Sequence, residues 1–164
     1  MSTERFVSVL TPVYLNVPER IRYLEQTLES FYKNNFFPGR VVHYIVDDRS
    51  PIGGEELDKL VSKYGLIHLG RIDPASRRSF HDVYLKLIQA VETEFFVYLE
   101  PDHYFYFPYD FITPALTLYR LERELHQVYF RAPLNYARFR RLSDSELCST
   151  DGTILRRVPI DSEN

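Results

Sequence analysis

Short apolar runs alternate along the chain with longer stretches in which apolar residues recur at helical spacing. Continuous apolar runs bounded by turn residues are typical of strands that are buried on both faces. Such runs occur at residues 6–10, 41–46, 66–69 and 95–99. Helical spacing is found between them and after them, at residues 18–32, 57–64 and 83–91. Strands that alternate with helices predict an α/β fold with a mainly parallel sheet flanked by helices.

The pattern changes in the last third of the chain. Apolar residues at helical spacing predict a helix over 110–126, where Pro114 is tolerated because it lies near the helix start. Asp151-Gly152 is a common turn pair. The segments 136–142 and 153–158 on either side of it predict a short β-hairpin-like region whose register stays open.

The composition bounds the class of protein. A chain of 164 residues is long enough for a proper core, so we predict a single domain over 1–164. The net charge of -3 gives no reason to expect nucleic-acid binding. The single Cys148 excludes an intramolecular disulfide and a multi-cysteine zinc site, which fits a cytoplasmic protein. The sequence contains neither an apolar run of the roughly 18–20 residues that span a membrane nor a signal-peptide pattern.

Two of the predicted strands end abruptly in carboxylates. Asp47-Asp48 closes the run 41–46, and Glu100-Pro101-Asp102 closes the run 95–99. Burying a strand that ends in carboxylates is costly unless these groups meet solvent, a cation or a ligand. In an open parallel sheet such ends lie side by side on the ligand-binding edge. We therefore expect a site for a nucleotide base, a ribose or a metal ion that bridges a diphosphate.

Three segments resemble motifs of the family 2 glycosyltransferases, which use the Rossmann-like GT-A fold. Val7-Ser8-Val9-Leu10-Thr11-Pro12-Val13-Tyr14 resembles their opening strand. Tyr44-Ile45-Val46-Asp47-Asp48-Arg49-Ser50 resembles their second-strand motif, usually Val-Asp-Asp-Gly-Ser. Phe96-Val97-Tyr98-Leu99-Glu100-Pro101-Asp102 resembles the strand that ends in their acidic DXD-type motif. The order and separation of the motifs match over residues 5–132.

The resemblance implies a site for a nucleotide-diphosphate sugar. Tyr14 would stack on the base, and Asp48 would accept a hydrogen bond from it, expected to be the imide N–H of uracil. Asp47 would support the loop or reach the ribose. Glu100 and Asp102 would be the two acids that hold Mn²⁺ or Mg²⁺ on the diphosphate, since a few carboxylates plus phosphate oxygens suffice for such an ion.

Arg77 and Arg78 lie in an irregular polar stretch, where related enzymes often place a basic residue near the nucleotide. An arginine can bind phosphate oxygens through two parallel hydrogen bonds. Structural alternatives exist for several of these assignments. The paired acids can cap a turn, Tyr14 can pack at the start of a helix, and the two arginines can lie on a solvated surface.

The sequence departs from the family pattern in two places. Arg49 replaces the usual Gly after the paired acids, and Pro51-Ile52 replaces the common Thr-Asp. The segment after the DXD-type strand is also short for an acceptor site, so 133–164 is interpreted as a short acceptor-side or assembly segment. An inverting reaction needs a base within hydrogen-bond reach of the acceptor hydroxyl. Glu146 is the first candidate for that base, and a plain loop carboxylate is the alternative.

The resemblance thus implies a metal-dependent glycosyltransferase that moves a sugar, with a UDP-sugar as the expected donor, to an acceptor hydroxyl. The acceptor is left open among saccharide, protein and lipid, and a homo-oligomer is compatible with this interpretation. One alternative is a non-catalytic nucleotide-binding or assembly protein that keeps the same sheet. Another is a nucleotidyltransferase, although the glycine-rich basic loop expected after its first strand is missing.

Overall fold

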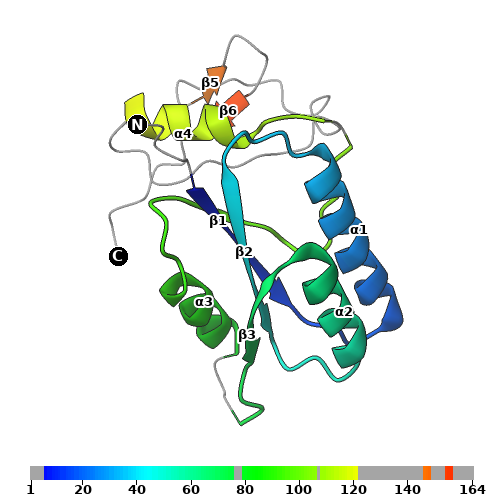
Figure 1. Cartoon of the computed structure of the whole chain (residues 1–164). Coiled ribbons are helices and arrows are strands. Elements are labelled where there is room, and N and C mark those ends of the chain that lie inside the picture. Colours follow the sequence, from blue (N-terminus) through cyan, green and yellow to red (C-terminus); the bar gives the residue numbers. More distant parts are fainter. Residues whose placement is uncertain (1–5, 76–78, 107, 122–145, 149–153, 157–164) are drawn as a thin grey trace. The chain divides into compact units, whose positions relative to one another are not determined.

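The computed structural model describes residues 6–75, 79–106, 108–121, 146–148 and 154–156. The chain divides into two compact units, Met1–Asp110 and Phe111–Asn164. The first unit contains a four-stranded parallel sheet with the strand order β3-β2-β1-β4 (Figure 1). Its strands are β1 (Phe6–Val13), β2 (Arg40–Asp47), β3 (Ile67–Arg71) and β4 (Phe96–Tyr98). Its helices are α1 (Pro18–Asn34), α2 (Gly54–Tyr64) and α3 (Ser79–Gln89). The predicted α/β class is confirmed.

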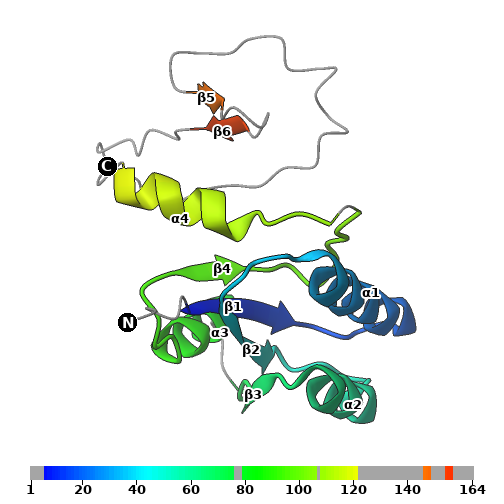
Figure 2. The same ribbon diagram turned by 45° about the horizontal axis from the view of Figure 1, so that its top comes forward.

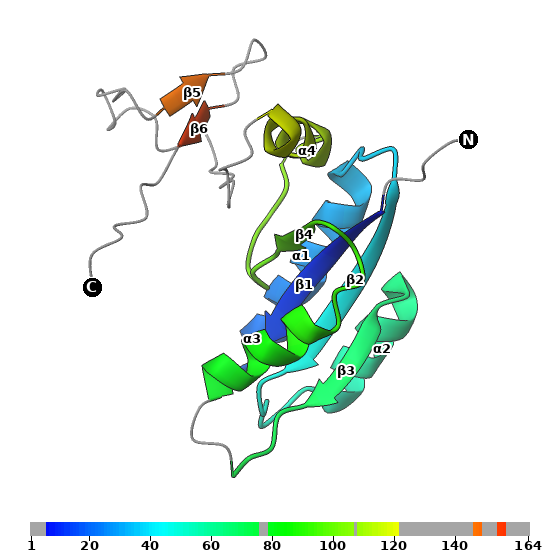
Figure 3. The same cartoon turned by 90° about the vertical axis from the view of Figure 1, so that its left-hand side faces the viewer.

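Helices cover both faces of this sheet. Figures 2 and 3 show α1 and α2 on one side of the strands and α3 on the other. Successive residues of a strand point to opposite faces, so Val13 joins the core under α1 and α2, whereas Leu10 joins the core under α3. The first core is made by Val13, Leu15, Leu24, Leu28, Ile45, Leu57, Leu60 and Leu66. The second is made by Leu10, Tyr44, Val46, Ile72, Val83 and Leu87.

The helix after β1 begins and ends where the sequence predicts. Pro18 occupies the first turn of α1, where its missing N–H leaves no intrahelical hydrogen bond unmade. Leu24, Leu28 and Phe31 are fully buried at helical spacing, which packs one face of α1 against the sheet. The helix ends at Asn34, close to the predicted boundary.

Strand β1 is longer than predicted. The sequence indicates a stop at Thr11-Pro12, yet the strand continues to Val13 and pairs with β2 as far as Asp47. A proline lacks the N–H that a ladder needs, so it is tolerated only where no partner strand faces it. The Leu99 N–H donates to the Leu10 carbonyl, so Leu10 faces β4, and β4 pairs with β1 only from Ser8 to Leu10. Pro12, two residues after Leu10, also faces the β4 side. Because β4 does not pair with β1 at Pro12, no ladder hydrogen bond is lost.

The strand order creates a reversal between β1 and β4. From β1 the chain moves through α1 and α2 toward β3, and it then returns through α3 to the other side of β1. Open α/β sheets bind ligands at the carboxyl ends of the strands at such a switch point. We therefore expect a ligand site at the carboxyl ends of β1 and β4.

Gly53, directly before α2, has a left-handed backbone conformation that favours glycine. Its φ is 78°, and an added Cβ would lie 2.9 Å from Cδ1 of Ile21. We expect Gly53→Ala to lower the free energy of unfolding by about 1–3 kcal/mol. Gly54 has no atom within 4 Å of its added Cβ and an unstrained φ, so Gly54→Ala should change stability by less than about 1 kcal/mol. Urea denaturation measures both, and equal effects of the two substitutions would contradict the prediction.

The second unit contains a helix and a hairpin. Helix α4 (Ile112–Leu121) carries Pro114 in its first turn, as predicted. Strands β5 (Glu146–Cys148) and β6 (Ile154–Arg156) pair antiparallel. The prediction that 136–142 pairs with the strand after it is wrong, because β6 pairs with β5. Strand β5 lies nearer to β6 in the sequence, and short connections are the common ones in hairpins. Residues 136–142 themselves lie outside the described residues. In the part of the chain that is described, no helix combines the length and apolar character needed to cross a membrane.

Candidate functional site

The paired acids at the end of β2 have different environments. Asp47 is 7% exposed, and its Oδ1 accepts a hydrogen bond from the Ser50 N–H at 2.7 Å. Its Oδ2 lies 3.5 Å from Nε of Arg71 at the end of β3. One carboxylate oxygen of Asp47 thus holds the loop that follows β2, and the other faces the end of β3. Asp48 is only partly buried, and its N–H donates to the Val13 carbonyl at 2.7 Å.

Arg49 occupies the position where the family motif usually has glycine. Its φ is 59°, in the left-handed region that glycine adopts at no cost. The departure in sequence therefore leaves a glycine-like backbone, at a conformational cost of about 1–2 kcal/mol for the arginine. Nε of Arg49 donates to Oδ1 of Asp48 at 3.3 Å, so this arginine places a positive charge beside the second acid.

Ser50 connects the ends of three strands. Its Oγ accepts a hydrogen bond from the Leu15 N–H at 2.8 Å, just beyond β1. Its N–H reaches Asp47 of β2, and its carbonyl accepts a hydrogen bond from Nη2 of Arg71 of β3. Sequence reasoning assigned no role to Ser50 or Arg71, although the serine belongs to the second-strand motif. These bonds make the edge of the sheet a fixed platform.

The second pair of acids follows β4. Here the chain turns, with the His103 N–H donating to the Glu100 carbonyl at 3.4 Å. The hydroxyl of Thr27 in α1 donates to the Pro101 carbonyl at 2.9 Å and holds this turn against the helix. The side chain of Asp102 is 72% exposed, and its Oδ1 lies 3.7 Å from Nδ1 of His103.

A hollow of about 100 Å³ lies at the ends of β1 and β4, and we call it the switch-point hollow. It brings together two predicted residues from opposite parts of the sequence, Tyr14 and Asp102. Tyr14 is 43% exposed, and its carbonyl accepts a hydrogen bond from Nη1 of Arg20 at 3.4 Å. The lining consists of Tyr14, Leu15, Arg20, Tyr23, Pro101 and Asp102. Arg20 and Tyr23 come from α1 and were not predicted.

Glu100 does not line this hollow. Its carboxylate interacts instead with Tyr98, whose ring stacks on Tyr84 of α3 with centroids 5.0 Å apart. Burial raises the pKa of the Tyr98 phenol above its ordinary value, and the hydrogen bond with Tyr84 and the charge of Glu100 add to the rise. Tyr98 therefore stays protonated and can donate to an acceptor. The structure places Glu100 beside this tyrosine and Asp102 in the hollow.

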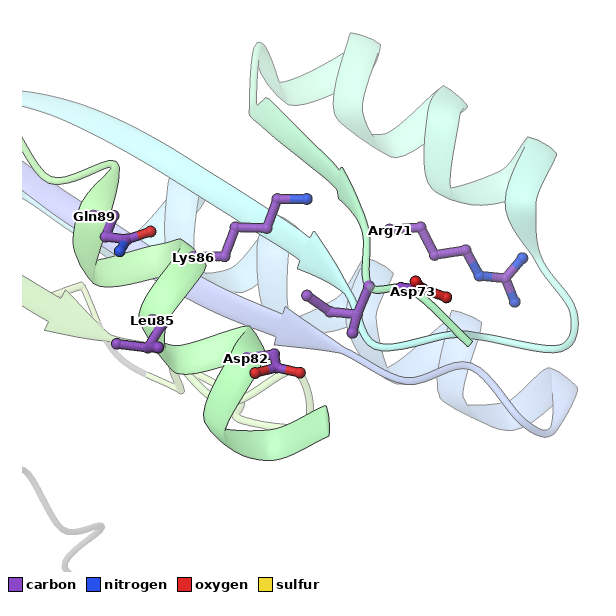
Figure 4. Close-up of a pocket in the computed structure, with 7 residues that line it drawn as sticks. Arg71, Asp73, Asp82, Leu85, Lys86 and Gln89 are labelled. Atoms are coloured by element: carbon purple, nitrogen blue, oxygen red, sulfur yellow. The ribbon is translucent and has the colours of Figure 1, made fainter. Parts of the chain in front are cut away.

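A larger hollow of about 460 Å³ lies between the end of β3 and α3 (Figure 4). Figure 4 shows Lys86 and Gln89 on α3, while Arg71 extends away from that helix. Two acidic and two basic residues line it, so their formal charges cancel. The lining consists of Arg71, Ile72, Asp73, Asp82, Leu85, Lys86 and Gln89. This hollow contains neither acidic strand end named by the sequence motifs. We therefore identify the switch-point hollow, despite its smaller volume, as the candidate site.

His43 lies in the core and not in the site. Its Nε2 is hydrogen bonded to the Thr11 hydroxyl at 2.8 Å, and its Nδ1 is hydrogen bonded to the Tyr32 hydroxyl at 3.1 Å. Burial lowers the pKa of His43 to about 3, so the imidazole is neutral at pH 7. Both ring nitrogens are occupied, which leaves this histidine a structural role.

The remaining predicted residues are placed only in part. Arg77 and Arg78 lie outside the described residues. The backbone of Glu146 lies in β5, opposite Arg156, in the second unit, and its side chain is outside the description. Among the described residues, no group of three or more His, Cys, Asp or Glu side chains gathers closely enough to hold a metal ion by itself.

Comparisons with known proteins identify the fold. No protein-family profile matches the chain, and no curated protein matches it. A crystal structure of the S. aureus glycosyltransferase TarS matches 71% of this chain with a TM-score of 0.51 and 19% sequence identity. Two structures of TarS 1-349, one of them in complex with UDP, match 73% with TM-scores of 0.51 and identities of 16% and 17%. The fold of this chain is therefore similar to that of a GT-A-like glycosyltransferase.

The likeness covers only part of the TarS chains. The matched region of this chain spans 20% of one TarS chain and 33% of the other two. At these identities the comparison establishes the arrangement of strands and helices, and the chemistry of the site has to be argued from the residues themselves.

Proposed function

We propose that this chain carries the donor site of a glycosyltransferase that uses a nucleotide-diphosphate sugar, with a UDP-sugar as the donor. The observation that carries the proposal is the switch-point hollow, which joins Tyr14 and Asp102 at the edge where α/β sheets bind ligands. The likeness to TarS, one structure of which holds UDP, supports a nucleotide as the ligand.

Each residue has a role that its environment allows. Tyr14 offers an exposed aromatic ring on which a nucleotide base stacks. Asp48 accepts a hydrogen bond from the imide N–H of uracil. Arg20, which also lines the hollow, carries a guanidinium group suited to phosphate oxygens. Asp47 acts by holding the loop, because its two oxygens already contact the Ser50 N–H and the Arg71 side chain.

The acidic turn after β4 fits a divalent metal ion that is shared with the substrate. The described residues form no closed cluster of three ligands, but Asp102 offers a largely exposed carboxylate. Mg²⁺ and Mn²⁺ are commonly held by one or two carboxylates together with phosphate oxygens and water. Asp102 would hold the ion, and Glu100 would join it as the second carboxylate on leaving its contact with Tyr98. A bound ion supplies Lewis-acid stabilisation of the charge on the diphosphate.

The transfer step is proposed to invert the anomeric centre. The acceptor oxygen forms a bond to the sugar carbon, the bond from that carbon to the diphosphate breaks, and the acceptor proton passes to a base. Glu146 is our candidate base, because the family resemblance calls for a carboxylate after the DXD-type strand.

One observation favours a second function. The switch-point hollow is smaller than the roughly 300–1,000 Å³ of ordinary ligand pockets, so most of a nucleotide would lie on the open edge of the sheet. A nucleotide-binding or assembly protein without turnover is consistent with this small hollow.

Nucleotide binding tests the proposal. We expect calorimetry to detect UDP binding that strengthens with Mn²⁺, and weaker binding of GDP and CDP. Tyr14→Ala should weaken UDP binding by about ten- to a hundredfold, since stacking contributes roughly 1–3 kcal/mol per base. Phe80→Ala removes an exposed aromatic ring from α3 and serves as the matched control. Absence of binding by all three nucleotides would overturn the donor-site proposal.

A further inference from the structure

The loop that follows Asp102 is fastened along one side of α1. Thr27 donates its hydroxyl hydrogen to the Pro101 carbonyl at 2.9 Å. Oγ of Ser30 accepts a hydrogen bond from the Phe105 N–H at 3.2 Å, and Nδ2 of Asn34 donates to the Phe105 carbonyl. Residues spaced by three and four lie on the same face of a helix, so these three polar side chains form one row.

Further contacts fix the middle and the end of this loop. The ring of Phe105 packs edge-on against buried Phe31, with centroids 5.4 Å apart. The Tyr109 N–H donates to the Asn34 carbonyl at 2.9 Å, and the Tyr109 carbonyl accepts from the Phe36 N–H at 3.5 Å. A loop held at its start, middle and end presents its remaining side chains in a set arrangement.

Tyr104 and Tyr106 point outward on either side of the anchored Phe105. They are 52% and 63% exposed, and their ring centroids lie 4.8 Å apart at an interplanar angle of 64°. We call this pair the aromatic platform. Large aromatic side chains that stay exposed on a fastened loop indicate a binding surface, because their burial elsewhere would have stabilised the fold.

The chemistry around the platform indicates the class of ligand. The segment 100–110 contains Glu100, Asp102 and Asp110 and has no Lys or Arg. Anionic lipid surfaces and phosphate-rich ligands are attracted by clustered Lys and Arg residues, which this segment lacks. The negative faces of aromatic rings attract the slightly positive C–H groups on one face of a sugar ring. Carboxylates and phenol groups pair with sugar hydroxyls.

We propose that Tyr104 and Tyr106 form a subsite for a neutral saccharide. One sugar ring of the saccharide packs against the aromatic platform. Tyr104 follows Asp102 by two residues, so their Cα atoms are at most about 7 Å apart. A saccharide seated there reaches the acidic turn of the switch-point hollow. That this saccharide is the acceptor rests on the proposed function. Saccharide binding by the aromatic platform does not depend on that function.

The test measures saccharide binding to the full chain without nucleotide. Cellohexaose, maltohexaose and chitohexaose are titrated by calorimetry into the wild type, Tyr104→Ala/Tyr106→Ala and Tyr104→Phe/Tyr106→Phe. We expect at least one of the saccharides to bind, with about tenfold weaker binding in the alanine variant. The phenylalanine variant keeps both ring faces and should retain most of the affinity. Phe80→Ala, on α3, is the control and should bind like the wild type.

Three results would overturn the subsite. The first is that none of the three saccharides binds at about 10 mM. The second is that the wild type and the alanine variant bind equally well. The third is that the protein binds no saccharide but sediments with phosphatidylcholine–phosphatidylglycerol vesicles, and that this sedimentation depends on the aromatic platform. UDP titrations on the same samples separate the two proposals. Saccharide binding without nucleotide binding supports the platform and overturns the donor site, and UDP binding without saccharide binding does the reverse.

Discussion

Asp102→Asn is expected to lower turnover of a UDP-sugar by a factor of about 10²–10³. Asparagine keeps the size of the side chain but removes the negative charge that a divalent ion needs as a ligand. Loss of one electrostatic partner of the developing charge typically costs about 2.7–4 kcal/mol of transition-state stabilisation. The measurement is the release of UDP from UDP-glucose and UDP-N-acetylglucosamine with Mn²⁺ and the saccharide that binds best.

The matched control is Glu94→Gln, which neutralises an exposed acid ahead of β4 that does not line the switch-point hollow. It should leave turnover unchanged. Full turnover by Asp102→Asn would exclude the metal role of Asp102. UDP binding by a wild type that shows no turnover would favour the non-catalytic alternative. This assay therefore separates a wrong residue assignment from a wrong function.

Much of the first unit is predictable because its two central strands, β1 and β2, are largely buried. A parallel strand with helices on both faces needs apolar residues at every position, so runs such as 41–46 stand out from their surroundings. Helix α3 begins earlier than the predicted residue 83, at Ser79. Periodicity reports only the buried face, and Phe80 in the first turn of α3 is exposed. The apolar pattern therefore becomes readable only from Val83, which is buried.

The composition of the candidate site is less predictable. Acidic strand ends were visible in the sequence, but Arg20 and Tyr23 join the hollow only through the direction that α1 takes after β1. The row of polar residues that fastens the aromatic loop depends on the same packing. Similarly, the sequence groups Glu100 with Asp102, and only the packing of Tyr98 on α3 separates them. Tertiary contacts, which no local pattern encodes, decide these placements.

The paired acids of β2 should respond differently to the same substitution. Asp47→Ala removes a buried carboxylate that accepts the Ser50 N–H and faces Arg71, and it should lower the free energy of unfolding by about 2–3 kcal/mol. Asp48→Ala breaks only a partly exposed contact with Arg49, so the change in stability should stay below about 1 kcal/mol. Asp48→Ala should instead weaken UDP binding by about tenfold, because a buried hydrogen bond to the base is lost.

Urea denaturation and UDP titration on the same variants separate stability from binding. Asp47→Asn keeps an oxygen for the Ser50 N–H but loses the charge opposite Arg71, so its stability should lie between those of the wild type and Asp47→Ala. The opposite pattern, with Asp48→Ala unfolding the protein and folded Asp47→Ala losing UDP, would mean that Asp47 contacts the nucleotide. Because the two residues are adjacent and chemically identical, a clear split would attribute the difference in stability to the environment of Asp47, namely its burial, its hydrogen bond from Ser50 and its ion pair with Arg71.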